Sequence, residues 1–203
     1  MFVQVITGKT SKAAEVRAAV DRWEKDLAPG AEGWLGSTAG VTADGRLVAL
    51  ARFESEEAAQ RNSDRPEQGE WWAEVAKLLD GEATFRNSVN VMPDLRGDPD
   101  QARFVQVMQG QQGPDPKRAQ ELMNQNSDEW AAFRPEVLGS LGIAHPDDTW
   151  TMVLYFTSEA DAREGERKEP PAELQAQMEE MNKLSVGDPE YFDLKDPWLS
   201  SGK

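Results

Sequence analysis

The sequence predicts an α+β fold made of two copies of one βαββαβ unit. A strand-like segment with the sequence FVQV, at Phe2–Val5, returns unchanged at Phe104–Val107. Each half also has a hairpin between two apolar segments, followed by a Ser-Glu pair that is typical of a helix start. Several such matches occur in the same order, so a duplicated unit explains them better than shared composition does.

The first half begins with an apolar strand and continues through two helical and three further strand segments. Apolar residues recur at helical spacing after Ser11, which can cap the first helix. A turn at Ala43–Gly45 joins the two middle strands, and Ser55 caps a second helical stretch that Asn62–Pro66 interrupts. The expected strands are Phe2–Thr7, Trp34–Val41, Arg46–Phe53 and Thr84–Val91.

The second half follows the same order of elements. Its hairpin turn lies at His145–Asp148, and Pro170 and Pro171 interrupt its second helical stretch where Pro66 interrupts that of the first half. The last strand has the weakest pattern. The expected strands are Phe104–Gln109, Val137–Ala144, Thr149–Phe156 and Tyr191–Leu194, with one helix over Pro116–Phe133 and another stretch from Ser158.

A charged segment that contains Pro93, Gly97 and Pro99 separates the two halves. Such a composition is typical of a linker. We therefore expect the first repeat at residues 1–92, a linker at 93–102, and the second repeat with a C-terminal tail at 103–203.

The composition excludes several classes of function. The formal net charge of −15 repels nucleic-acid phosphates and anionic lipid, so we expect neither nucleic acid nor a membrane as a partner. The chain has no cysteine, which excludes disulfides and thiolate chemistry. Its single histidine, His145, falls in the predicted turn, where we expect it to face solvent rather than act as a base, and one histidine cannot form a His-rich metal site.

Other features of the sequence bear on location and on metal binding. The first residues lack the pattern of a signal peptide, and no apolar run approaches the roughly 18 residues of a membrane span. A cytoplasmic location is therefore expected. A site made of carboxylates alone stays open, although the many acidic residues are better explained as solvated faces, and we expect no metal.

The strands are apolar on both faces, which bears on how the repeats pack. Val3 and Val5 alternate with Phe2 and Ile6. A βαββαβ unit folds as an antiparallel sheet with both helices on one face, so the other face needs a second cover, and the sheet of the other repeat would supply it.

The order of elements and the run FESEEA at Phe53–Ala58 resemble the dimeric α+β barrel superfamily, with the closest similarity to its antibiotic-biosynthesis-monooxygenase branch. Members of this superfamily usually form the barrel from two chains. The resemblance implies two ferredoxin-like repeats whose antiparallel sheets pack together as a barrel-like pseudo-dimer within one monomeric chain.

The superfamily includes cofactor-independent oxygenases of aromatic polyketides, haem-degrading enzymes, isomerases and members without known chemistry. Haem-degrading members use an Asn, a Trp and a His, and the corresponding positions here hold Ile6, Asn62 and Trp71. Because none of the three matches, and because haem ligation usually needs a histidine, we expect no haem and no other cofactor.

Polar side chains within apolar strands are the candidate site residues. Gln4 and Gln106 hold the same position in the two repeats, and their amides could bind a ligand carbonyl or hydroxyl, or each other. Arg52 could hold an anionic or enolate oxygen, and Tyr155, which takes its place in the second half, could donate a proton. Both could instead be rim residues.

Two further candidates lie in the first half. Asn87 and Asn90 point to opposite faces of their strand, so only one of them can face the interior. Trp71 fits the core stripe of its helix, whereas Trp72 points in another direction and can line a pocket mouth or a partner surface. With these tryptophans and Arg52, the first half is expected to hold any functional pocket.

Two hypotheses about function follow. The first is a barrel protein that binds a small aromatic or lipophilic molecule, with cofactor-independent monooxygenase-like activity in which a stabilised substrate enolate reacts directly with oxygen. The second is a non-catalytic stress-associated or interaction module with a packed interior. The sequence has no convincing general base, so it leaves open whether the chain is an enzyme. The candidate catalytic residues are Arg52 and Tyr155, and the candidate ligand-binding residues are Gln4, Gln106, Asn87 and Trp72.

Overall fold

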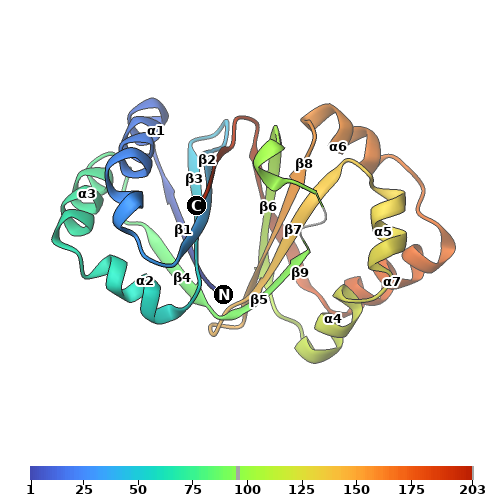
Figure 1. The fold of residues 1–203 in the computed structure, drawn as a ribbon. Helices are drawn as coiled ribbons and strands as arrows, with labels where there is room; N and C mark the ends of the chain where they lie inside the picture. Colours follow the sequence, from blue (N-terminus) through green and yellow to red (C-terminus); the bar gives the residue numbers. More distant parts are fainter. Residues whose placement is uncertain (95–96, 203) are drawn as a thin grey trace. The chain divides into compact units, whose positions relative to one another are not determined.

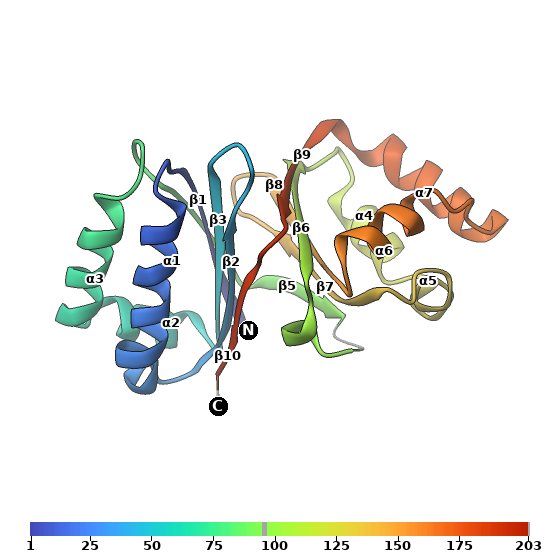
Figure 2. The ribbon, with the colours of Figure 1, turned by 90° about the horizontal axis from the view of Figure 1, so that it is seen from above.

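The structure, a computed structural model, describes residues 1–94 and 97–202. The chain divides into two compact units, of which the first contains Met1–Val91 and Phe192–Lys203 and the second contains Met92–Tyr191. Each unit has one five-stranded sheet with helices on one of its faces (Figure 1, Figure 2). The predicted fold class, α+β with two ferredoxin-like βαββαβ repeats and antiparallel sheets, is confirmed.

The sheet of the first unit has the strand order β10-β2-β3-β1-β4. The first helix continues into a short π-helical turn and a 3-10 turn before the second strand begins. The elements are β1 (Phe2–Lys9), α1 (Ala13–Arg22), η1 (Trp23–Leu27), η2 (Ala28–Gly30), β2 (Trp34–Val41), β3 (Arg46–Phe53), α2 (Glu56–Ser63), α3 (Pro66–Ala76), β4 (Thr84–Ser88) and β10 (Trp198–Ser201).

The sheet of the second unit has the strand order β5-β7-β8-β6-β9. Its central strands repeat the arrangement of the first sheet, with β6, β7 and β8 in the places of β1, β2 and β3. The elements are β5 (Asn90–Asp94), η3 (Pro99–Gln101), β6 (Phe104–Gln111), α4 (Pro116–Met123), α5 (Ser127–Phe133), β7 (Val137–Ala144), β8 (Thr149–Phe156), α6 (Glu159–Glu166), α7 (Ala172–Leu184) and β9 (Val186–Leu194).

Two expected elements are divided in the structure. The strand expected over Thr84–Val91 ends at Ser88, and the next strand, β5, joins the other sheet. The helix expected over Pro116–Phe133 is broken at Asn126, which has a left-handed φ of 54°. Asparagine adopts this conformation more readily than most residues, so the break occurs where the first half has Trp23 and its helix continues.

The start of α1 also differs from the expectation. Ser11 does not cap this helix, because its N-cap residue is Lys12 and no side chain caps it. The hydroxyl of Thr10 instead accepts a hydrogen bond from the Lys12 amide at 2.9 Å. Of the expected linker, residues 97–102 include the short helix η3, whereas Leu95 and Arg96 lie outside the described residues.

Strand register assigns each residue of the first sheet to one of its two faces. Phe2 packs against Ala58 and Ala59, so Phe2, Gln4 and Ile6, which share one face of β1, lie on the helix-covered face. Val3 pairs with Arg52 and lies on the opposite face. Both faces are buried here, with Phe2 3% and Val3 0% exposed.

Within residues 1–94 and 97–202, none of the helices combines the length and the apolar character needed to span a membrane.

Candidate functional site

Gln4 and Asn87 form a pair on the helix-covered face of the first sheet. They are direct neighbours across β1 and β4, and Gln4 Nε2 donates a hydrogen bond to Asn87 Oδ1 at 3.1 Å. Gln4 is half-buried and Asn87 is exposed. The Gln4 amide nitrogen therefore bonds within its own sheet and not to Gln106, the partner considered in the sequence analysis.

The pair keeps hydrogen-bonding groups available. In the described part of the chain, neither Gln4 Oε1 nor Asn87 Nδ2 has a hydrogen-bond partner. A side-chain amide has one acceptor oxygen and a two-proton donor nitrogen. The pair can thus offer an acceptor and a donor to a small molecule while the Gln4–Asn87 bond fixes both side chains.

Trp72 and Phe85 lie beside this amide pair. Phe85 of β4 lies opposite Ile6 of β1. Because Phe85 is two residues from Asn87 on the same strand, the two side chains lie on the same face. The rings of Trp72 and Phe85 meet edge to face with their centroids 5.0 Å apart. Phe85 is 45% exposed, so this aromatic pair forms a surface that solvent and ligands can reach.

The aromatic contacts continue inward from Trp72. Ring centroids are 6.1 Å apart between Trp72 and Trp71, 6.2 Å between Trp71 and Trp23, and 5.1 Å between Trp23 and Trp34. We call Trp23, Trp34, Trp71, Trp72 and Phe85 the aromatic row. It runs from the start of β2 through η1 and α3 to the edge strand β4.

The inner tryptophans of the aromatic row are satisfied by hydrogen bonds. Trp71 Nε1 donates to the Ala19 carbonyl at 2.8 Å, and Trp23 Nε1 donates to Gln68 at 2.6 Å. Trp71 also packs against the cluster that contains Trp23, in agreement with its expected core role. Trp72 Nε1, by contrast, has no acceptor among the described residues, so Trp72 is the member of the row that keeps an available donor.

The second unit lacks this arrangement. Asn126 and Gln175 stand where the first half has Trp23 and Trp72. Gln177 of α7 accepts hydrogen bonds from Asn126 at 3.2 Å and from Trp130 at 3.0 Å, and it donates to the Leu122 carbonyl. A closed amide network thus links α4, α5 and α7.

Arg52 lies on the opposite face of the first sheet from Gln4 and Trp72. It pairs with Val3 and is only 8% exposed. Its Nε is buried without a hydrogen-bond partner. The structure therefore does not bring Arg52 together with the other candidates of the first half, and its role towards an enolate oxygen stays a prediction.

Tyr155 and Gln106 belong to the second unit. Gln106 is two residues from Phe104 on β6 and shares its face, and because Phe104 packs on Ala162 of α6, Gln106 lies on the helix-covered face of its sheet. Tyr155 pairs with Val105 on the other face and is 1% exposed. The predicted roles of both residues in binding or catalysis stay predictions.

The expectation that His145 faces solvent was wrong. His145 is 4% exposed, and its Nε2 lies 2.8 Å from Thr151 Oγ1. The backbone explains this position, because the His145 amide also bonds to the Thr149 carbonyl and closes the hairpin. His145 is therefore part of the packed hairpin of the second unit.

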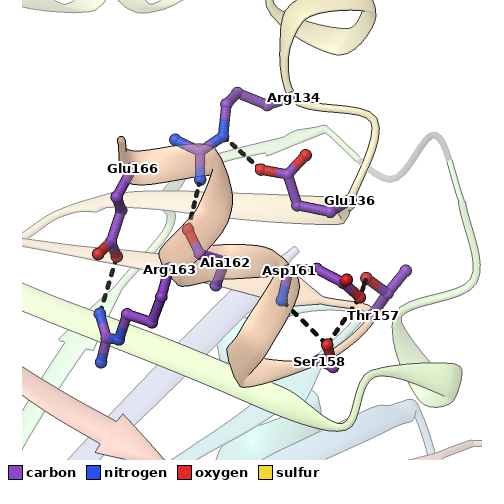
Figure 3. Close-up of polar contacts among 8 residues, drawn as sticks. All are labelled: Arg134, Glu136, Thr157, Ser158, Asp161, Ala162, Arg163 and Glu166. Atoms are coloured by element: carbon purple, nitrogen blue, oxygen red, sulfur yellow. Dashed lines mark hydrogen bonds and ion pairs between the residues drawn. The ribbon is translucent and has the colours of Figure 1, made fainter. Parts of the chain in front are cut away.

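A polar cluster around α6 of the second unit has a structural role (Figure 3). Arg134 forms an ion pair with the buried carboxylate of Glu136 and also donates to the Ala162 carbonyl. At the start of α6, Asp161 accepts hydrogen bonds from Thr157 and Ser158, which hold the pKa of Asp161 below its ordinary value of 3.8. The cluster fixes the ends of one helix.

No group of three or more His, Cys, Asp or Glu side chains in residues 1–94 and 97–202 is placed to hold a metal ion.

Phe85 is the site residue that the sequence analysis did not single out. The available signal was its spacing from Asn87, since two residues apart on a strand share a face.

No protein-family model matches the sequence, and no curated protein matches it either. Solved structures do match. A putative monooxygenase from Fusobacterium nucleatum subsp. nucleatum ATCC 25586 has a TM-score of 0.78 at 9% identity, covering 98% of this chain and 94% of that one. A putative monooxygenase from Lactobacillus acidophilus NCFM has a TM-score of 0.76 at 13% identity, covering 99% and 96%.

An anthrone oxidase-like protein is also similar, with a TM-score of 0.67 at 12% identity and coverage of 99% of this chain and 93% of that one. At such identities the likeness establishes the fold. The chain has a tandem-repeat α+β fold, which it shares over nearly its whole length with these putative monooxygenases.

Proposed function

We propose that the chain binds a small aromatic molecule with a carbonyl or hydroxyl group on the helix-covered side of its first unit, and that it acts on this molecule as a cofactor-independent monooxygenase-like enzyme. The observation that supports the proposal is the Gln4–Asn87 amide pair beside the exposed edge of Trp72 and Phe85. Amide groups fix the orientation of a ligand whose rings pack on aromatic side chains.

Each residue of this site has a distinct part in the proposed reaction. Asn87 Nδ2 donates to the ligand oxygen and stabilises the negative charge that develops there in an enolate. Gln4 holds Asn87 in place through its hydrogen bond. Trp72 and Phe85 contact the rings of the ligand and reduce the access of water to the enolate.

Anthrone is a suitable probe, since one of the similar structures is described as anthrone oxidase-like. Loss of a proton from its methylene carbon to solvent gives an enolate. The enolate reacts with one molecule of oxygen. The methylene carbon becomes a second ketone that keeps one oxygen atom, and the other oxygen atom leaves as water.

Binding can be measured without turnover by titrating anthrone under anaerobic conditions and following tryptophan fluorescence. We expect Trp72→Gln and Asn87→Ala each to weaken binding by about fivefold to tenfold, the value of one lost ring contact or hydrogen bond. Trp72→Gln is compatible with the fold because Gln175 holds this position in the second half. Asn90→Ala, a nearby change outside the site, should leave the affinity unchanged. Equal affinities in the wild type and the three variants would contradict the proposed binding site.

Turnover is tested by oxygen consumption and anthraquinone formation in air. The wild-type protein should accelerate both above the rate in buffer, and Asn87→Ala should lower the rate constant for turnover more than the affinity. Binding without acceleration would favour the alternative function.

The alternative is a non-catalytic interaction module. The hydrogen-bonded and packed inner part of the aromatic row supports it, since Trp23 and Trp71 have the contacts of core residues. The absence of a histidine from the first unit supports it as well. In either case we propose that the chain acts as a monomer in the cytoplasm without a nucleic-acid partner, in keeping with its net charge of −15.

A further inference from the structure

Arg52 is a buried cation that the proposed function does not use. Its side chain is 8% exposed, and its Nε is buried without a hydrogen-bond partner. Among residues 1–94 and 97–202, no side chain or carbonyl forms a hydrogen bond or an ion pair with its guanidinium. The other arginine on the same face of β3, Arg46, forms an ion pair with Asp44 at 2.8 Å.

Such a position is costly unless an anion occupies it. Removing a charge from water without a compensating partner is strongly unfavourable. Lysine or histidine could lose its proton in response, but arginine remains protonated in proteins. A negatively charged group bound beside Arg52 would offset this cost.

The backbone around Arg52 is built to receive its guanidinium. Gly36 pairs with Arg52 across β2 and β3, at a point where the register shifts, and has a φ of +136° that side chains rarely allow. A Cβ at Gly36 would lie 2.5 Å from Arg52 Nη2 and 2.5 Å from the Ser200 carbonyl oxygen. The missing side chain is thus what lets the guanidinium lie against β2 and β10.

The twin position in the second unit is neutral. Tyr155 pairs there with Gly139 and is 1% exposed. The same strand position therefore folds with an uncharged side chain, which means that the charge of Arg52 is a property of the first unit and not a requirement of the fold.

We propose that Arg52 binds the carboxylate of a small organic acid, at a site separate from the aromatic row and on the opposite face of the first sheet. The planar guanidinium matches a carboxylate through two parallel hydrogen bonds. The nearest strand positions on this face are uncharged: Val3, Gly36 and Leu50. Arg52 therefore supplies one positive charge, which matches a ligand with one negative charge. A phosphate dianion commonly takes more cations or a helix N-terminus.

The test is thermal unfolding of the full chain in acetate, with chloride replaced at constant ionic strength. When the ligand concentration is ten times Kd, binding raises the ratio of folded to unfolded protein about elevenfold. For a chain of this size, that change corresponds to a rise of roughly 3–6 °C in Tm. We expect a saturable rise in the wild type, none in Arg52→Tyr, and an undiminished rise in Arg46→Gln, which removes a paired arginine from the same face.

The variant Arg52→Tyr copies the residue of the twin position, so it is expected to fold. Should it unfold, Arg52→Lys is the substitute, and it should keep a weaker rise in Tm because it retains the charge without the planar fork. No specific effect of acetate in the wild type, or an equal effect in Arg52→Tyr, overturns the proposal, and a rise given by inorganic phosphate but not by acetate overturns the carboxylate assignment. The rise in Tm with acetate should be undiminished in Trp72→Gln, which removes a residue of the proposed aromatic site, so the two proposed sites can fail independently.

Discussion

At the residue scale, the missing side chain of Gly165 leaves the space that the polar cluster beside α6 occupies. Gly165 lies in α6, and a Cβ there would overlap the Glu136 carboxylate and come within 2.5 Å of Arg134 Nε. Because Glu136 is buried and bonded to Arg134, it cannot move away without exposing or separating the ion pair. In the first half Asn62 holds this position and bonds to Arg65.

Gly165→Ala should therefore destabilise the protein, although alanine normally favours a helix. Overpacking of a filled site costs about 1–3 kcal/mol of unfolding free energy. The matched control is Gly69→Ala in α3, where nothing lies within 4 Å of the added Cβ. The control should gain up to about 1 kcal/mol. Urea unfolding followed by circular dichroism measures both, and equal effects would contradict the assigned contact.

At the scale of the elements, serine caps begin the corresponding helices of the two repeats. Ser55 accepts a hydrogen bond from the Ala58 amide at 3.2 Å, and Ser158 accepts one from the Asp161 amide at 3.1 Å. Both caps were predicted from the Ser-Glu pairs. In the second cap, Ser158 and Thr157 also donate hydrogen bonds to the Asp161 carboxylate.

Loss of the cap should change both stability and the titration of Asp161. Ser158→Ala should cost about 1 kcal/mol of unfolding free energy. It should also raise the pKa of Asp161 from its lowered position towards the ordinary value of 3.8, which NMR titration of the carboxyl carbon measures. Ser55→Ala should cost a similar amount and leave Asp161 unchanged, and a pKa of Asp161 that ignores Ser158→Ala would contradict the assignment.

The direction of the pH dependence follows from the lowered pKa of Asp161. A carboxylate with a lower pKa in the folded state stabilises the protein at pH values above its unfolded-state pKa. This contribution disappears as the pH falls through the lower, folded-state value. Asp161→Asn should therefore flatten the acid limb of the stability curve below about pH 4.

At the scale of the whole molecule, each sheet receives its fifth strand from the chain that follows the other repeat. Strand β5 comes after β4 and pairs in the second sheet beside β7, and β10 comes after β9 and pairs in the first sheet beside β2. Trp198 of β10 is 6% exposed and packs with Val16 and Leu47. The guanidinium of Arg17 lies 5.4 Å from the centre of its ring.

Trp198→Ala should destabilise the protein by about 3–5 kcal/mol of unfolding free energy, the usual cost of removing a buried aromatic side chain. A chain that ends at Pro197 should lose at least as much, because it also exposes the edge of β2. Urea unfolding followed by circular dichroism reports both. A truncated chain as stable as the full chain would contradict the role of β10.

The sequence by itself determined the two repeats, the class of most elements and the apolar character of both faces of the strands, because these depend on local patterns and on spacing within a segment. It also singled out Gln4, Asn87 and Trp72, which the structure places close together on one side of a sheet. The sequence did not predict the burial of His145, which depends on a hydrogen bond to Thr151. It also did not predict the helix break at Asn126, which depends on a left-handed backbone angle. Neither feature can be read from the pattern of hydrophobic residues.

Only the tertiary structure decided which residues share a face and which strands share a sheet. Alternation along one strand separates odd from even residues, but it does not say which set the helices cover. Register between strands decided that Arg52 lies opposite Gln4 and Trp72. The exchange of β5 and β10 was decided in the same way, since strand pairing joins backbone groups that are distant in the chain and that no local pattern connects.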